Sequence, residues 1–110
     1  MKYSHKDLQK GKWFELDLIN QMANIGSEVF RTISSKEKNL NKDAQKAFYR
    51  SLELLELTLN DSKNKNRLKE ITRTKEMFID WYLGNPLYKS TSQDWQKYFF
   101  QFNMAARLNT

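Results

Sequence analysis

The segment QDWQKYFFQFNMAARLN, residues 93–109, decides how the rest of this 110-residue chain must fold. Its apolar residues follow helical spacing in two adjacent rows: Trp95, Phe99, Phe102 and Ala106, and Phe100, Met104 and Leu108. Only Asp94, Lys97 and Arg107 are charged. A helix that is apolar around most of its circumference has to be covered. We therefore expect at least two neighbours to pack against it, from its own chain or from another subunit.

Three upstream segments show the same helical periodicity of apolar residues. The four predicted helices span about residues 14–38, 42–59, 67–83 and 92–108, and the polar segment 60–66 (NDSKNKN) is expected to be a surface loop. Helices joined by short connections pack antiparallel, each beside its predecessor. The sequence therefore predicts an all-α fold, an antiparallel up-down-up-down four-helix bundle over residues 13–110. Residues 1–12 lack periodicity and are expected to be a flexible basic arm.

Residues at the predicted helix ends support this division. The expected boundary residues are Asn39 and Asn41 before the second helix, Gly84 and Pro86 after the third, and Thr91 with Asp94 at the start of the fourth. Asparagine caps helix N-termini, and glycine takes the left-handed conformation that ends a helix. Thr91 and Asp94 have the spacing of a capping box, in which the two residues bond each other's backbone.

Two features of the first predicted helix indicate contacts with other helices. Gly26 within a helix costs about 1 kcal/mol relative to alanine, so we expect another helix to pack closely there. A weakly charged polar face is formed by Asn20, Gln21, Asn24 and Ser27. We interpret this face as a subunit contact.

Several classes of protein are excluded by composition. Cysteine is absent, which excludes a disulfide framework, a thiolate zinc site and a cysteine nucleophile. No apolar run is long enough to cross a bilayer, and the N-terminus lacks the apolar middle of a secretory signal. We therefore expect a cytoplasmic protein with no membrane partner.

The sequence contains no catalytic constellation. It has no glycine-rich phosphate loop, no H-E-x-x-H motif and no nucleophile elbow. Its one histidine, His5, lies in the predicted arm, and Glu53 and Glu56 lie one turn apart without a histidine to complete a di-metal site. We predict a non-enzymatic protein with no cofactor, no metal and no small-molecule substrate.

Positive charge is the strongest functional signal. The formal net charge is +6, and residues 1–12 contribute +3 of it. The densest cluster of cations consists of Lys63, Lys65, Arg67, Lys69, Arg73 and Lys75. Within it, Lys65, Lys69 and Arg73 have i, i+4, i+8 spacing, so one helix face could neutralise successive phosphates. We therefore predict that these six residues bind nucleic acid.

The alternative interpretation of this cluster is a solvated face compensated by Glu70, Glu76 and Asp80. The neighbouring aromatic residues, Trp81 and Tyr82, fit helix packing better than base stacking. No motif of the common nucleic-acid-binding domains is present.

The length, the predicted helix order and the basic charge resemble a family of small four-helix bundles encoded by intervening sequences in bacterial large-subunit ribosomal RNA genes. The accessory variability proteins of diversity-generating retroelements are related to that family. The resemblance is architectural and covers about residues 13–108. It implies a ring-like oligomer, typically a pentamer, with a basic surface that contacts nucleic acid. No diagnostic motif is matched, so no binding residue carries over.

Two other comparisons bear on function. The stretches QMANIGSEVFR (Gln21–Arg31) and KYFFQFNMAAR (Lys97–Arg107) look more like a group of uncharacterised small bacterial proteins, which names no function. The helical HEPN nucleases need a histidine shortly after an arginine on a late helix, and neither Arg73 nor Arg107 is followed by one.

Two functional hypotheses follow from the sequence. The first is a homo-oligomeric helical bundle that binds nucleic acid, RNA before DNA, through a basic surface. The alternative is a protein–protein adaptor or structural oligomer without nucleic-acid binding, which would use the apolar circumference of the last helix.

Overall fold

The computed structural model describes residues 11–85 and 87–108, most of which are helical. Its elements are α2 (Leu18–Glu37), α3 (Asn41–Leu59), the 3-10 helix η1 (Ser62–Arg67), α4 (Leu68–Leu83) and α5 (Ser92–Leu108). Residues 11–15 form a further helical segment, and no strand occurs anywhere in the described ranges. The prediction of an all-α fold is confirmed. Most of the predicted arm lies outside the described residues, and Gly11 and Lys12 belong to the helical segment.

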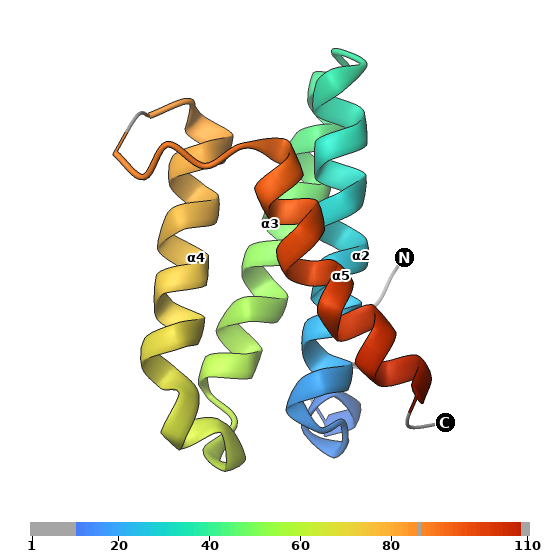
Figure 1. The fold of residues 1–110 in the computed structure, drawn as a ribbon, viewed down its shortest axis with the longest axis vertical. Coiled ribbons are helices and arrows are strands. Elements are labelled where there is room, and N and C mark those ends of the chain that lie inside the picture. The colour runs from blue at the N-terminus through green and yellow to red at the C-terminus, as the bar shows by residue number, and fades with distance from the viewer. Residues whose placement is uncertain (1–10, 86, 109–110) are drawn as a thin grey trace.

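Helix α2 is central to the arrangement, because it packs against both α3 and α5. Helix α4 flanks α3 on the other side, and α5 crosses obliquely over α2 (Figure 1). The expectation that each helix lies beside its predecessor therefore differs from the structure for α5, whose main backbone neighbour is α2 rather than α4. The four-helix up-down-up-down topology stays a prediction.

Gly26 is the point where α2 and α5 approach each other. A Cβ atom at Gly26 would lie 3.0 Å from the Cβ of Phe99, and the Phe99 side chain is fully buried. This contact confirms the prediction that Gly26 admits a second helix. The surrounding core is formed by Met22, Ile25, Val29, Phe78, Trp95 and Phe99. Burial of side chains of this size is the main source of stability in the fold.

Aromatic packing joins α4 to its neighbours. The ring of Tyr82 stacks on Phe48 of α3 with centroids 3.8 Å apart, and Phe78 meets Trp95 of α5 edge-on at 5.5 Å. Trp81 stacks on Phe78 in the same helix. The packing role predicted for Trp81 and Tyr82 agrees with these contacts.

Helix α2 begins later than expected. The sequence predicted its start near residue 14, but the chain leaves the helical segment 11–15 and α2 starts at Leu18. Asp17 caps it, because Asp17 Oδ1 accepts a hydrogen bond from the backbone nitrogen of Asn20 at 2.9 Å. This backbone bond, with the side-chain bond from Asn20, lowers the pKa of Asp17.

The predictions for the other helix ends are confirmed in part. Gly84 has φ 77 and ends α4 in the left-handed conformation, as predicted. The capping box is also present: Thr91 Oγ1 accepts from the Asp94 nitrogen at 3.1 Å, and Asp94 Oδ2 accepts from the Thr91 nitrogen at 2.9 Å. The predicted asparagine cap of α3 is wrong. Leu40 occupies that position without a side-chain hydrogen bond, and Asn39 has φ 60 in the turn after α2.

The predicted surface loop at 60–66 is partly buried. Most of it forms η1, and the side chains of Asp61 and Asn64 are only 7% and 2% exposed. Gln21, which the sequence predicts in a subunit contact, is instead fully buried within its own chain, where it bonds Asp61 and Asn64. Its Nε2 donates to Asp61 Oδ2 at 2.8 Å, and its Oε1 accepts from Asn64 Nδ2 at 2.9 Å. The correction has a physical reason: buried backbone and side-chain polar groups need partners, and this polar segment supplies them.

Candidate functional site

Three of the six cations predicted to bind nucleic acid are held by carboxylates of their own chain. The ion pairs are Lys63–Asp61, Arg67–Glu70 and Lys75–Glu56. Lys63 Nζ also donates to the backbone carbonyl of Phe14 at 2.8 Å, so it fastens the N-terminal helical segment to η1. The hydrogen bond to Glu70 raises the pKa of Arg67. These three cations have partners that an outside anion would have to displace.

The other three cations, Lys65, Lys69 and Arg73, are exposed and form no ion pair within residues 11–85 and 87–108. Lys69 and Arg73 lie one turn apart on α4. Lys65 belongs to η1, whose 3-10 turn is tighter than an α-helical turn. The predicted stripe is therefore not one continuous α-helical row, although all three charges remain at the exposed surface where η1 continues into α4.

A cleft of about 360 Å³ opens beside Arg73, between α4, the connection to α5, and α5 itself. Helix α4 contributes Arg73 and Met77 to its lining, the connection contributes Tyr88 and Lys89, and α5 contributes Trp95 and Tyr98. Arg73 and Met77 follow Lys69 at successive four-residue steps along α4. The row of exposed cations therefore leads into the cleft.

The wall formed by the connection is anchored by two hydrogen bonds. Gly84 turns the chain away from α4, and buried Asp80 then accepts a hydrogen bond from the Tyr88 nitrogen at 3.2 Å. Nearer to α5, Trp95 Nε1 donates to Ser90 Oγ at 3.1 Å. Lys89 lies between these anchors with φ 54, an uncommon conformation for a residue other than glycine. The anchors hold Tyr88 and Lys89 at the cleft.

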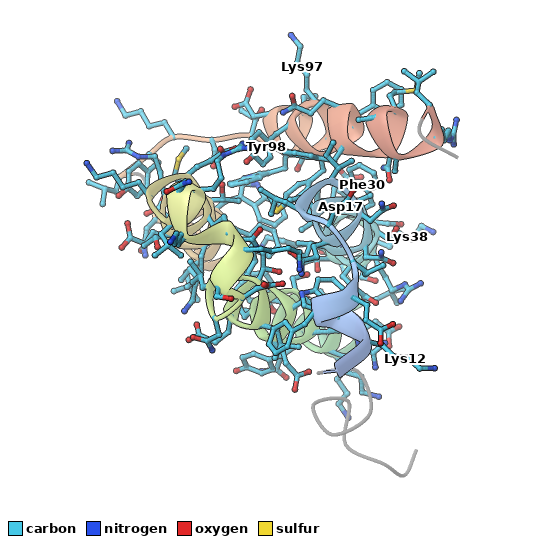
Figure 2. All side chains as sticks on the ribbon, turned by 90° about the horizontal axis from the view of Figure 1, so that it is seen from below. Lys12, Asp17, Phe30, Lys38, Lys97 and Tyr98 are labelled. Carbon is cyan, nitrogen blue, oxygen red and sulfur yellow. The ribbon has the colours of Figure 1, made fainter. Side chains whose placement is uncertain are left out.

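The Tyr98 hydroxyl forms part of the inner wall. It donates to Glu70 Oε2 at 2.9 Å and lies 3.2 Å from Thr74 Oγ1. Burial raises the pKa of Tyr98 to about 12, so the hydroxyl stays protonated near neutral pH. Tyr98 points inward from α5, whereas its neighbour Lys97 points away from the molecule (Figure 2). The wall is thus an aromatic surface with a neutral polar group.

The cleft contains both signs of charge. Arg73 and Lys89 form no ion pair in the part of the chain that the structure describes. Glu70 and Asp94 also line the cleft, but both have internal partners. Glu70 is bonded by Arg67 and Tyr98, and Asp94 Oδ2 by the Thr91 nitrogen. Arg73 and Lys89 are therefore the charged side chains of the cleft without an internal partner in the described residues, and Asp94 keeps one carboxylate oxygen, Oδ1, without a bond there.

A larger groove of about 1080 Å³ runs along α3 and is also lined by charged residues. Two of its cations are already paired, Arg50 with Glu28 at 3.6 Å and Lys75 with Glu56 at 2.8 Å. Glu53 and Glu56 add negative charge to the same surface. This groove is a weaker candidate for an anionic ligand than the cleft beside Arg73.

Sequence reasoning did not identify Tyr88, Lys89 or Tyr98 as site residues. One signal was present in the connection GNPLYKST, where Tyr88 and Lys89 are an aromatic residue and a cation side by side. Their approach to Arg73 depends on the path of the connection after Gly84. That path is set by the bond between Asp80 and the Tyr88 backbone, which no spacing pattern reveals.

Neither a metal site among the described residues nor a similarity to known proteins adds a functional assignment. The described residues hold no group of three or more His, Asp or Glu side chains placed to bind a metal ion. Among the described helices, none combines the length and hydrophobicity needed to traverse a bilayer. Searches against protein-family models, curated proteins and solved structures found no significant match to the chain.

Proposed function

We propose that this chain is a non-enzymatic, homo-oligomeric four-helix bundle that binds nucleic acid through the basic surface at the start of α4. The observation that carries the proposal is the exposure of Lys65, Lys69 and Arg73 without an acidic partner in the described residues. Paired cations gain little from a phosphate, because they must give up a carboxylate first. Unpaired cations release counterions from the nucleic acid, which drives binding. As in the sequence analysis, we propose RNA before DNA as the ligand.

Salt-dependent binding of the wild type and a charge-reversal variant tests this proposal. The variant carries Lys65→Glu, Lys69→Glu and Arg73→Glu, and the measurement is fluorescence anisotropy with a structured RNA and a DNA duplex. Each lost phosphate contact should reduce the slope of log affinity against log salt by about 0.7–0.9, so the triple variant should lose roughly two to three units of slope. We also expect the binding that persists near 0.15 M salt to disappear.

A matched variant separates a local surface from general attraction to a basic protein. It carries Lys42→Glu, Lys46→Glu and Lys97→Glu, three exposed cations on α3 and α5. Each replacement changes +1 to −1, so both variants fall from a net charge of +6 to zero. Binding by this control should retain most of the wild-type affinity. Equal losses in the two variants, or no loss in the first, would contradict the proposal.

A second candidate function, a protein–protein adaptor or structural oligomer, is favoured by the outer row of α5. Phe100, Met104 and Leu108 are 54%, 38% and 79% exposed. The inner row packs as expected, with Trp95 and Phe99 buried against the chain's own core. Exposed apolar residues aligned on one helix face are typical of contact surfaces. The same row also provides the surface for the homo-oligomer in the first candidate.

A further inference from the structure

We infer that the cleft between α4, residues 88–90 and α5 binds one unstacked nucleotide of a single-stranded RNA. The inference rests on the proposed function, and it adds that the protein prefers single-stranded RNA to a duplex. Three observations carry it: the position of the cleft, its mixed chemistry, and the Tyr88 ring, which has no aromatic partner within the described residues.

The position links the cleft to the basic surface. Lys69, Arg73 and Met77 succeed one another on α4, and the last two line the cleft. A strand whose phosphates follow the exposed cations therefore reaches the opening of the cleft. Lys89 stands on the opposite wall as a second cation. The volume of about 360 Å³ lies near the lower end of small-ligand sites, roughly 300–1,000 Å³, and suits a single nucleotide rather than a duplex.

The chemistry of the lining favours a ligand that is only partly anionic. Arg73 and Lys89 can hold a phosphate, but Glu70 and Asp94 line the same cleft and would repel a compact polyanion. A nucleotide combines a phosphate with a neutral aromatic base, so it meets both requirements. Asp94 Oδ2 is bonded to the Thr91 nitrogen, and Oδ1 has no hydrogen bond within the described residues. That oxygen can accept a bond from the amino group of a base.

Tyr88 supplies the surface on which a base can stack. Its backbone is fixed by Asp80, its side chain is half-buried, and its ring makes no aromatic contact within the described residues. The other aromatic residues of the cleft are already packed. Trp95 is 4% exposed and contacts Phe78, and Tyr98 contacts Trp95, Phe99 and Phe102. Base stacking on an aromatic ring is tolerant of sequence and requires a base that has left its helix.

The test compares a single-stranded RNA with the same sequence in a duplex, each bound to the full chain at 0.15 M salt. Tyr88→Ala removes the ring and keeps the backbone bond to Asp80. We expect single-stranded RNA to bind this variant on the order of tenfold more weakly, with little change for the duplex. Tyr88→Phe keeps the ring and should retain wild-type binding. Tyr49→Ala, which removes an exposed tyrosine from α3, is the matched control and should change neither affinity.

The possible results separate the two proposals. If the wild type binds neither RNA at this salt concentration, the proposed function fails and the inference fails with it. If both RNAs bind and the α4 charge reversal abolishes binding, but Tyr88→Ala leaves the single-strand affinity unchanged, only the inference about the cleft is overturned. Binding of an acidic, aromatic peptide that depends on Tyr88, without binding of RNA, would overturn it in favour of a protein ligand. Thermal unfolding of each variant verifies that it is folded.

Discussion

Asp61 is a buried carboxylate whose hydrogen-bond donors come from two parts of the chain, α2 and η1. It accepts hydrogen bonds from Gln21 Nε2, Lys63 Nζ and the Lys63 backbone nitrogen. Burial acts to raise the pKa of Asp61, but the bonds from Lys63 and Gln21 outweigh it and the pKa lies below its ordinary value of 3.8. The charged form is therefore the one that stabilises the fold.

Replacing Asp61 with asparagine should make stability less sensitive to acid. In the wild type, the contribution of a carboxylate with a lowered pKa is complete above 3.8 and is lost as the pH falls below that value toward the folded-state pKa. Asp61→Asn removes the charge at every pH, so it should cost about 1–3 kcal/mol at pH 7 and progressively less in acid. Urea unfolding at a series of pH values measures both effects.

The control for Asp61 is Glu15→Gln, which removes an exposed carboxylate from the neighbouring helical segment. We expect its unfolding free energy to stay near that of the wild type. A constant difference between the wild type and Asp61→Asn from pH 7 down to pH 2 would contradict the assigned role of the Asp61 charge.

At the scale of elements, the crossing of α2 and α5 depends on the absence of a side chain at Gly26. Alanine there would gain about 1 kcal/mol of helix propensity. Its Cβ would also lie 3.0 Å from Phe99 Cβ and 3.3 Å from two atoms of the Phe99 ring. Because Phe99 is fully buried, its side chain cannot easily move away. Overpacking of a core typically costs about 1–3 kcal/mol, so the steric effect prevails.

Gly26→Ala is therefore expected to lower the unfolding free energy by about 1 kcal/mol. Gly11→Ala is the matched change, because Gly11 is also in a helical segment and a Cβ there meets nothing within 4 Å. The Gly11 variant should be as stable as the wild type or slightly more stable. Chemical denaturation compares the two, and a Gly26 variant at least as stable as the wild type would show that α5 shifts freely on α2.

Sequence patterns predicted the helices and helix ends that depend on residues close together in the chain. Periodic apolar residues located α3, α4 and α5 closely, while Gly84 and the Thr91–Asp94 box marked boundaries through bonds within a few residues. Patterns did not predict the burial of Asp61, because its bond to Gln21 joins distant segments. Of the ion pairs in the predicted cation cluster, only Lys75–Glu56 joins distant segments, because Asp61 and Glu70 lie within three residues of Lys63 and Arg67. The cleft was not predicted because three separate elements build it.

At the scale of the whole molecule, the chain leaves an apolar strip on its outside. Helix α5 lies on one face of the molecule (Figure 1). The exposure of Phe100, Met104 and Leu108 shows that the described elements do not cover its outer row. Phe30 of α2 and Phe100 of α5 border a shallow hollow beside this row. A second copy of the chain that presents the same strip would cover both, as in a symmetric pairing of identical surfaces.

Polar substitutions in the outer row should therefore dissociate the oligomer. Phe100→Gln with Met104→Gln is expected to shift the particle mass, measured by light scattering at micromolar concentration, to that of the monomer. Leu83→Gln with Leu87→Gln is the matched control, because these residues are 62% and 75% exposed but lie at the end of α4 and in the connection, outside the outer row of α5. A monomeric wild type, or an oligomer that survives the α5 changes, would contradict this role of the outer row.

The pairing of α2 with α5 also determines when the chain can complete its fold during synthesis. Helix α2 is made before α5, so its contacts around Gly26 await Trp95 and Phe99 near the other end of the described chain. At about 5–20 residues per second, that interval is on the order of several seconds. During this interval, the side of α2 that packs against α5 is exposed and can bind other apolar surfaces. Among the described helices, the one that leaves the ribosome last is the one that closes the core.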